Sequence, residues 1–230
     1  MITFRGLGNH GRLGNQIWQI AGAIAIARSR DDDFVIDEAW KYRDCFSFPN
    51  EFFGKPDGIH APTLWETYPA WTADYLGNLQ FVEAIEGDLR EWLQPSQKIQ
   101  SLLEPYSYKD RVAVHVRRED YLTNPLHLVL DSDWYQPIPN EALFFGLDLA
   151  WIRENFPDAE IVETGDEILD FFLMASCQAN VISNSTYAWW AAWIADGPCI
   201  APRWWYARGY GLDDNSHNMP KHWTLKENFR

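Results

Sequence analysis

Three features are scarce in this sequence, and each scarcity argues against a class of protein. Cysteine occurs three times, at Cys45, Cys177 and Cys199. The number is odd and the spacing fits no metal site, so we expect reduced, buried thiols in a cytoplasmic protein. Positive charge is also scarce, because 19 Lys and Arg stand against 33 Asp and Glu, a formal net charge of -14. This balance argues against nucleic acid or an anionic membrane as the main partner.

Long apolar runs are the third scarce feature. No stretch reaches the roughly 20 apolar residues that a membrane-spanning helix needs. The segment 17–27 has the length of a signal-peptide core, but glycines precede it and Gln19 interrupts it. We therefore predict a helix of the folded protein here, and no transmembrane segment.

Aromatic side chains, in contrast, are abundant. The chain has 13 Trp and 16% aromatic residues within 230 residues that are 47% hydrophobic. That is enough apolar material for a sizeable core, in one large domain or two small ones. The aromatic content fits carbohydrate binding and equally fits a Trp-rich core. Composition leaves both interpretations open.

Hydrophobic patterns predict strands and helices that alternate along the chain, which is typical of an α/β fold with mainly parallel strands. Residues 40–79 show little periodicity and predict irregular loops, a plausible acceptor-facing surface. The Pro- and Tyr-containing stretch 104–110 is the best candidate for a domain boundary. The predicted strands are 34–37, 112–116, 142–145, 160–163, 180–182 and 199–201, and the predicted helices are 16–28, 77–93, 96–103, 150–156, 166–176 and 187–195.

The most informative stretch is 111–121, RVAVHVRREDY. Valine at every second position predicts a buried strand. The strand leads directly into Arg117 and Arg118, at the end of an α/β sheet where ligands bind. A guanidinium group offers a planar fork of donors that matches phosphate oxygens. The stretch predicts a diphosphate site; the alternative is an arginine pair bridged to Glu119 and Asp120 on a surface turn.

Two other segments predict a strand that leads into a helix with polar groups at the turn. Residues 2–16 are Gly-rich, and Arg12, Asn15 and Gln16 would point at a ligand, although a Gly-rich turn with an Asn cap is an equal interpretation. Residues 183–186, SNST, would form a helix N-terminus rich in hydroxyl groups, which is a ready anion site.

Three blocks in order resemble one family. The blocks GRLGNQIWQIA (11–21), VAVHVRREDY (112–121) and ISNSTYAWWAAWIA (182–195) look like the signature blocks of the α-1,2-fucosyltransferases. These form glycosyltransferase family eleven, within the wider α-1,2/α-1,6/protein O-fucosyltransferase group. The resemblance covers most of the chain after Ala142 and little between Asp31 and Glu104.

The resemblance implies a GT-B-like α/β fold of two Rossmann-like domains that face each other across a cleft. The first domain, 1–105, would be reduced and lie on the acceptor side, and the second, 106–230, would bind the nucleotide sugar. The implied activity is that of a galactoside α-1,2-fucosyltransferase. It moves fucose or a related sugar from a GDP-sugar to a glycan hydroxyl, with inversion and without an essential metal or other cofactor.

The resemblance also assigns roles to residues. Arg117 would bind the donor β-phosphate and stabilise the leaving group, and β alternation places Arg118 on the opposite face, where it would pair with a carboxylate. Arg12 and Asn15 would reach the reacting sugar from the first domain. Independently of the resemblance, an acceptor hydroxyl must lose a proton, and Glu119 and Asp120 are both candidates for the general base. The donor-binding set would comprise His115, Gly14, Gln16, Arg118, Ser183, Asn184, Ser185 and Thr186.

The sequence departs from the family pattern at two turns. The family usually has Gly where this chain has Glu119, and commonly has Ser-Asp-Asp where this chain has Gly146, Leu147 and Asp148. The second turn lies near the nucleoside in the group, so the base that is bound stays open. The chain is also shorter than typical members.

Two other functions fit parts of the sequence. Asp131 and Asp133 form an Asp-x-Asp at the end of an apolar run, which in a metal-dependent transferase holds a divalent ion on a diphosphate. The aromatic content fits a non-catalytic sugar-binding protein. Metal dependence tests the first alternative, and donor turnover tests the second.

Overall fold

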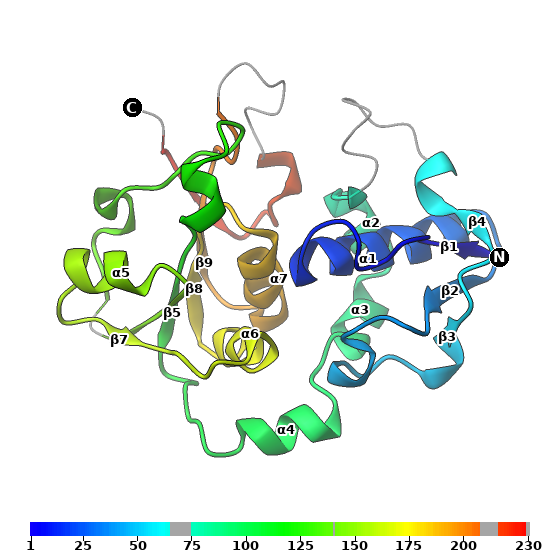
Figure 1. Cartoon of the computed structure of the whole chain (residues 1–230), viewed down its shortest axis with the longest axis horizontal. Helices are drawn as coiled ribbons and strands as arrows, with labels where there is room; N and C mark the ends of the chain where they lie inside the picture. The colour runs from blue at the N-terminus through cyan, green and yellow to red at the C-terminus, as the bar shows by residue number, and fades with distance from the viewer. Residues whose placement is uncertain (65–74, 140, 208–215, 229–230) are drawn as a thin grey trace. The chain divides into compact units, whose positions relative to one another are not determined.

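The computed structural model describes residues 1–64, 75–139, 141–207 and 216–228 (Figure 1). The chain divides into two compact units, Met1–Ser101 and Leu102–Arg230. The division lies near the boundary that the sequence predicts at about residue 105. Residues 65–74, part of the predicted acceptor-facing region, lie outside the described residues.

The N-terminal unit is built on a parallel sheet with the strand order β3-β2-β1-β4. The long helix α1, Leu13–Ser29, follows β1 and is buried along almost its whole length. The helix has apolar residues on all its sides, which is typical of a helix inside a core. The predicted helix at residues 17–27 is therefore confirmed as an element of the folded unit. The remaining elements are β1 Ile2–Thr3, β2 Phe34–Asp37, β3 Phe53–Gly54, β4 Ile59–His60, α2 Leu79–Ala84, α3 Glu86–Trp92 and α4 Gln97–Leu103.

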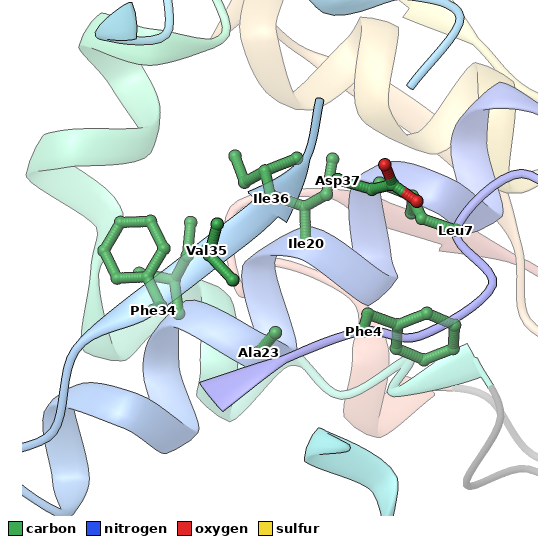
Figure 2. Close-up of a pocket in the computed structure, with 9 residues that line it drawn as sticks. Phe4, Leu7, Ile20, Ala23, Phe34, Val35, Ile36 and Asp37 are labelled. Atoms are coloured by element: carbon green, nitrogen blue, oxygen red, sulfur yellow. The ribbon is translucent and has the colours of Figure 1, made fainter. Parts of the chain in front are cut away.

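A small pocket lies between α1, β2 and the segment that follows β1 (Figure 2). Its empty volume is about 220 Å³, part of which is open to solvent, and eight of its nine lining residues are apolar. The exception is Asp37, whose Oδ1 accepts a hydrogen bond from the Ala39 amide at 2.9 Å. The pocket contains none of the predicted site residues, so it is a gap in the core and carries no functional assignment.

The C-terminal unit is built on a six-stranded sheet with the order β10-β9-β8-β5-β6-β7, and all its strand pairs are parallel. In chain order this is 3-2-1-4-5-6, the arrangement of the Rossmann fold, and the N-terminal sheet has the first four places of the same order. The elements are β5 Val112–Val116, β6 Ala142–Gly146, α5 Leu149–Asn155, β7 Glu160–Ile161, α6 Glu167–Ala175, β8 Ala179–Val181, α7 Thr186–Ala195, β9 Cys199–Pro202 and β10 Thr224–Lys226.

Helices cover both faces of the C-terminal sheet, with α6 and α7 side by side on one face and α5 on the other (Figure 1). Alternate residues of β5 reach the two faces. Val114 and Val116 pack with Phe144 and Ile152 on the α5 side, and His115 lies on the side of α7. The predicted α/β fold class, two units with parallel Rossmann-like sheets, is confirmed, and the GT-B-like arrangement of the units across a cleft stays a prediction.

The structure differs from the predicted elements in two ways. The helix predicted at 77–93 is two helices, because Ile85 leaves helical geometry between α2 and α3. The strands β3, β4 and β10 were not predicted. They are two or three residues long and lie at or next to sheet edges, where alternation is too short to detect. Within the described part of the chain, no helix is long and apolar enough to cross a membrane.

Candidate active site

The candidate site of the C-terminal unit lies where the strand order changes direction, between β5 and β8. These strands pair in parallel, with Val112 beside Ala179 and Val114 beside Val181. The chain leaves β5 toward β6 and leaves β8 toward β9, so the loops after the two strands separate. Ligands of open α/β sheets bind at this position. We call the residues 115–121 and 183–187 around it the switch-point site.

His115 and Ser183 join the two strands of the switch-point site. His115 Nδ1 and Ser183 Oγ are 2.8 Å apart, and the two residues are 5% and 0% exposed. The imidazole ring lies 5.8 Å from the ring of Tyr187 on α7. Burial and this hydrogen bond fix the orientation of the imidazole ring, so the His115 side chain is held in one position at the site.

Asn184 fixes the loops around the site. Its Nδ2 donates to the carbonyl groups of Leu128 and Trp205, both at 2.8 Å, and its own carbonyl accepts from the Tyr121 hydroxyl at 2.9 Å. The residue is 1% exposed. Its side chain therefore joins the loops after β5 and β9, which is a structural role beyond the predicted donor contact.

Helix α7 begins at the switch-point site. Ser185 is the N-cap residue, with extended backbone angles of -130° and 126°, and its side chain forms no capping hydrogen bond. Thr186 is the first helical residue. The first N–H groups of a helix lack partners within the helix, and the helix dipole adds positive potential there. Together with the buried Ser185 hydroxyl, this end of α7 is suited to an anion.

Arg117 lies at the end of β5 and is 14% exposed. Its Nη1 donates to Glu119 Oε2 at 3.0 Å, and its Nη2 donates to Asp120 Oδ1. The guanidinium carbon lies 5.1 Å from the centre of the Tyr121 ring. The alternative interpretation of the sequence, a salt-bridged arginine on a turn, therefore describes the contacts that Arg117 makes here.

Arg118 points to the α5 side of the sheet, as β alternation predicts. Its Nε donates to Asp148 Oδ2 at 3.3 Å, its Nη1 donates to the Leu130 carbonyl at 3.2 Å, and its guanidinium carbon lies 4.2 Å from the centre of the Trp151 ring. Asp148 also caps α5, since its Oδ1 accepts from the Trp151 amide. Arg118 thus holds the start of α5 against the loop after β5.

The first-block residues lie at the start of α1 in the N-terminal unit. Arg12 is the exposed N-cap residue, Asn15 is half-buried, and Gly14 is buried within the helix. Gln16 is 4% exposed, donates to the Gly11 carbonyl at 3.0 Å and accepts from Trp40 Nε1 at 2.9 Å. Gln16 therefore holds the Gly-rich loop on α1, and Arg12 and Asn15 are the side chains of this block that reach the surface.

An aromatic stack beside Arg117 was not predicted. The rings of Tyr121 and His127 are parallel within 6° with centroids 4.0 Å apart, and Tyr206 lies 5.6 Å from His127. Burial lowers the pKa of His127 below its ordinary 6.5, and the charge of Asp120 opposes this in part. Tyr121 and His127 lie close together after a predicted strand, which is a local signal, whereas Tyr206 is distant in sequence and no local pattern identifies it.

Asp131, one of the two carboxylates of the metal alternative, has a structural role. Asp131 Oδ1 accepts from the Trp134 amide at 3.0 Å and so caps a short 3-10 helix, Ser132–Tyr135. Across the described ranges, no three His, Cys, Asp or Glu side chains group as metal ligands would. Cys177 and Cys199 are buried as predicted, whereas Cys45 is half-buried. Burial raises the pKa of Cys177 to about 12 and that of Cys199 well above its ordinary value.

Fold and site together define an α/β protein with a candidate anion site at the switch point of its C-terminal sheet. Residues 84–226, more than half of the chain, match the family described as Glycosyl transferase family 11. The chain belongs to this family, which confirms the resemblance of the three sequence blocks.

Curated relatives agree with this membership. The O-antigen biosynthesis glycosyltransferase WbnK of Escherichia coli is 34% identical over 41% of this chain and 39% of its own length. The alpha-1,2-colitosyltransferase of Escherichia coli is 23% identical over 57% and 58%, and the galactoside alpha-(1,2)-fucosyltransferase 1 of Bos taurus is 30% identical over 46% and 33%. The matches span 33% to 58% of these relatives' own length.

Among solved structures, the chain resembles a crystal structure of NodZ alpha-1,6-fucosyltransferase soaked with GDP-fucose. The TM-score is 0.44 at 15% sequence identity, over 83% of this chain and 89% of that chain. This likeness is too weak to support an inference about ligands.

Proposed function

We propose that the chain is an inverting glycosyltransferase that moves fucose or a related sugar from a GDP-sugar to a glycan hydroxyl in α-1,2 linkage. The reaction would need no essential metal. The observation that carries the proposal is the meeting of Arg117, the His115–Ser183 pair and the N-terminus of α7 at one switch point. Family membership and the names of the relatives, which include colitosyl and fucosyl transferases, support the reaction class.

The chemistry requires stabilisation of a leaving diphosphate. The acceptor oxygen bonds to the anomeric carbon, the bond from that carbon to the β-phosphate oxygen breaks, and GDP departs with the electron pair. Preorganised donors aimed at the developing charge supply several kcal/mol, typically about 3 for one donor. The guanidinium of Arg117 and the first N–H groups of α7 are such donors, and they supply positive potential without a metal ion.

The acceptor hydroxyl also loses a proton. Asp120 is 59% exposed and lies on the turn beside Arg117, so it is the carboxylate that we assign to accept this proton. Arg12 and Asn15 are assigned to the reacting sugar, because they are the surface side chains of the first block. This assignment requires that the two units bring α1 to the switch-point site.

A melting screen with nucleotides tests the proposal. A ligand that binds the folded state at a hundred times its Kd stabilises it by about 2.7 kcal/mol. We expect GDP to raise the melting temperature more than UDP or ADP, in buffer with EDTA. Equal or greater stabilisation by UDP would contradict the GDP-sugar assignment. Donor turnover with GDP-fucose and a galactoside in EDTA then separates an enzyme from a non-catalytic sugar-binding protein, and loss of turnover in EDTA would favour a metal-dependent transferase.

A further inference from the structure

The guanidinium fork of Arg117 is occupied by two carboxylates of its own turn. Nη1 donates to Glu119 at 3.0 Å and Nη2 donates to Asp120. These terminal nitrogens are the donors that a guanidinium uses for a bidentate grip on phosphate oxygens. Two carboxylates therefore occupy the hydrogen-bonding positions of Arg117 that an incoming diphosphate needs.

The ion pairs of the site leave it without excess positive charge. Arg117 and Arg118 face three carboxylates, those of Glu119, Asp120 and Asp148, so this group has a formal charge of -1. The Glu119 side chain is 33% exposed, against 59% for Asp120. Attraction between charges is stronger where water screens it less, so Glu119 is the stronger competitor for Arg117.

The turn presents Glu119 to Arg117 in an unfavourable backbone conformation. Its φ is 25°, on the left-handed side that non-glycine residues avoid. Hydrogen bonds hold the turn in place, since the Tyr121 amide donates to the Arg118 carbonyl at 2.6 Å and the Tyr121 hydroxyl to the Asn184 carbonyl. The ion pair with Arg117 offsets part of the backbone cost, and the carboxylate has a route to solvent.

We propose that Glu119 sets the affinity of the site for the donor diphosphate by competing with it for Arg117. This inference rests on the proposed function, in which Arg117 binds the β-phosphate. On binding, the hydrogen bond from Nη1 passes from the carboxylate oxygen to a phosphate oxygen, the Glu119 side chain turns to solvent, and no proton moves. Glu119 thus acts through Arg117 and determines affinity.

Calorimetric titration with GDP and with guanosine tests the inference. For Glu119→Gln and for Glu119→Gly, we expect the Kd for GDP to fall about tenfold, which corresponds to about 1.4 kcal/mol. The Kd for guanosine, which has no phosphate, should stay unchanged. The control Glu160→Gln also removes one negative charge, from an ion pair with Arg111 before β5, and should leave both constants unchanged. Melting temperatures verify that each variant is folded.

The outcomes separate the inference from the proposed function. Equal GDP affinity in the parent and in Glu119→Gln overturns the inference alone. A gain confined to Glu119→Gly also overturns it, because the backbone and not the carboxylate would then be responsible. If neither the parent nor any variant binds GDP, the proposed function fails and the inference falls with it.

Discussion

At the scale of single residues, the two neighbouring arginines have different surroundings, and this difference predicts opposite effects of the same substitution. Arg117→Lys keeps the charge but loses the fork, so turnover should fall by roughly a hundredfold. The melting temperature should change little, because the partners of Arg117 lie on its own turn.

Arg118→Lys is the matched control. It weakens the contacts with Asp148, Leu130 and Trp151, so we expect a loss of about 1–2 kcal/mol in unfolding free energy and a much smaller loss of turnover. Donor turnover and melting temperature are measured for both variants beside the parent. Equal turnover losses in the two variants would show that Arg117 and Arg118 do not have the different roles assigned to them.

The partly buried ring of His127 predicts that the unfolding free energy depends on pH. Its pKa in the folded protein lies below the ordinary 6.5, mainly because the ring is buried. At pH values between its folded and its unfolded pKa, the His127 side chain is protonated in the unfolded chain and neutral in the folded chain. The contribution of His127 to the unfolding free energy is therefore full above pH 6.5 and falls as the pH drops below 6.5. His127→Phe keeps a ring beside Tyr121 and removes the titration.

The measurement is the difference in unfolding free energy between parent and His127→Phe. We expect the parent to lose stability relative to the variant as the pH falls from about 8 to about 5. A difference that is constant across this range would show that His127 titrates normally in the folded protein.

At the scale of elements, the turn from β6 to α5 depends on Gly146. Its φ is 159°, and a Cβ there would lie 2.5 Å from the Val116 carbonyl oxygen. Val116 ends the strand that carries Arg117, so a shift would disturb both the sheet and the site. We expect Gly146→Ala to cost about 2–4 kcal/mol of unfolding free energy.

Gly87→Ala is the control for this substitution. Gly87 lies in α3, and no atom is within 4 Å of the Cβ that it would gain. Alanine is the better helix former by about 1 kcal/mol, so this variant should be slightly stabilised. Denaturant unfolding compares the two, and a Gly146→Ala variant as stable as the parent would refute the steric argument.

At the scale of the whole molecule, three residue pairs that build the switch-point site join residues of the C-terminal unit. The pairs His115–Ser183, Arg118–Asp148 and Tyr121–Asn184 all fall within residues 102–230. We expect a fragment of residues 97–230, which keeps α4 whole, to fold. Its Kd for GDP should lie within roughly a few-fold of the Kd of the full chain. It should transfer no sugar, because Arg12 and Asn15 are absent.

Titration calorimetry and a turnover assay measure these two properties. The same fragment with Arg117→Ala is the control and should not bind GDP. A folded fragment that fails to bind would show that the N-terminal unit contributes to donor binding, against the assignment of the donor site to one unit.

The sequence by itself determined the α/β class, most strand and helix positions and the residue types of the site. Local signals were sufficient for these, because alternating valines, a glycine-rich turn and a run of capping hydroxyls act over a few residues. The strands that it missed, such as β10, are short edge strands with few apolar residues. The break at Ile85 was missed because helix periodicity continues across it.

Tertiary structure alone decided which residues meet. His115 and Ser183 are 68 positions apart, and they touch because β8 pairs with β5 and not with β7, the strand that precedes it in sequence. Arg118 contacts Asp148 across 30 positions through the pairing of β5 with β6, the next strand in the chain. Strand pairing depends on contacts distant in sequence, so local patterns identify the members of the site and only the folded sheet selects their partners.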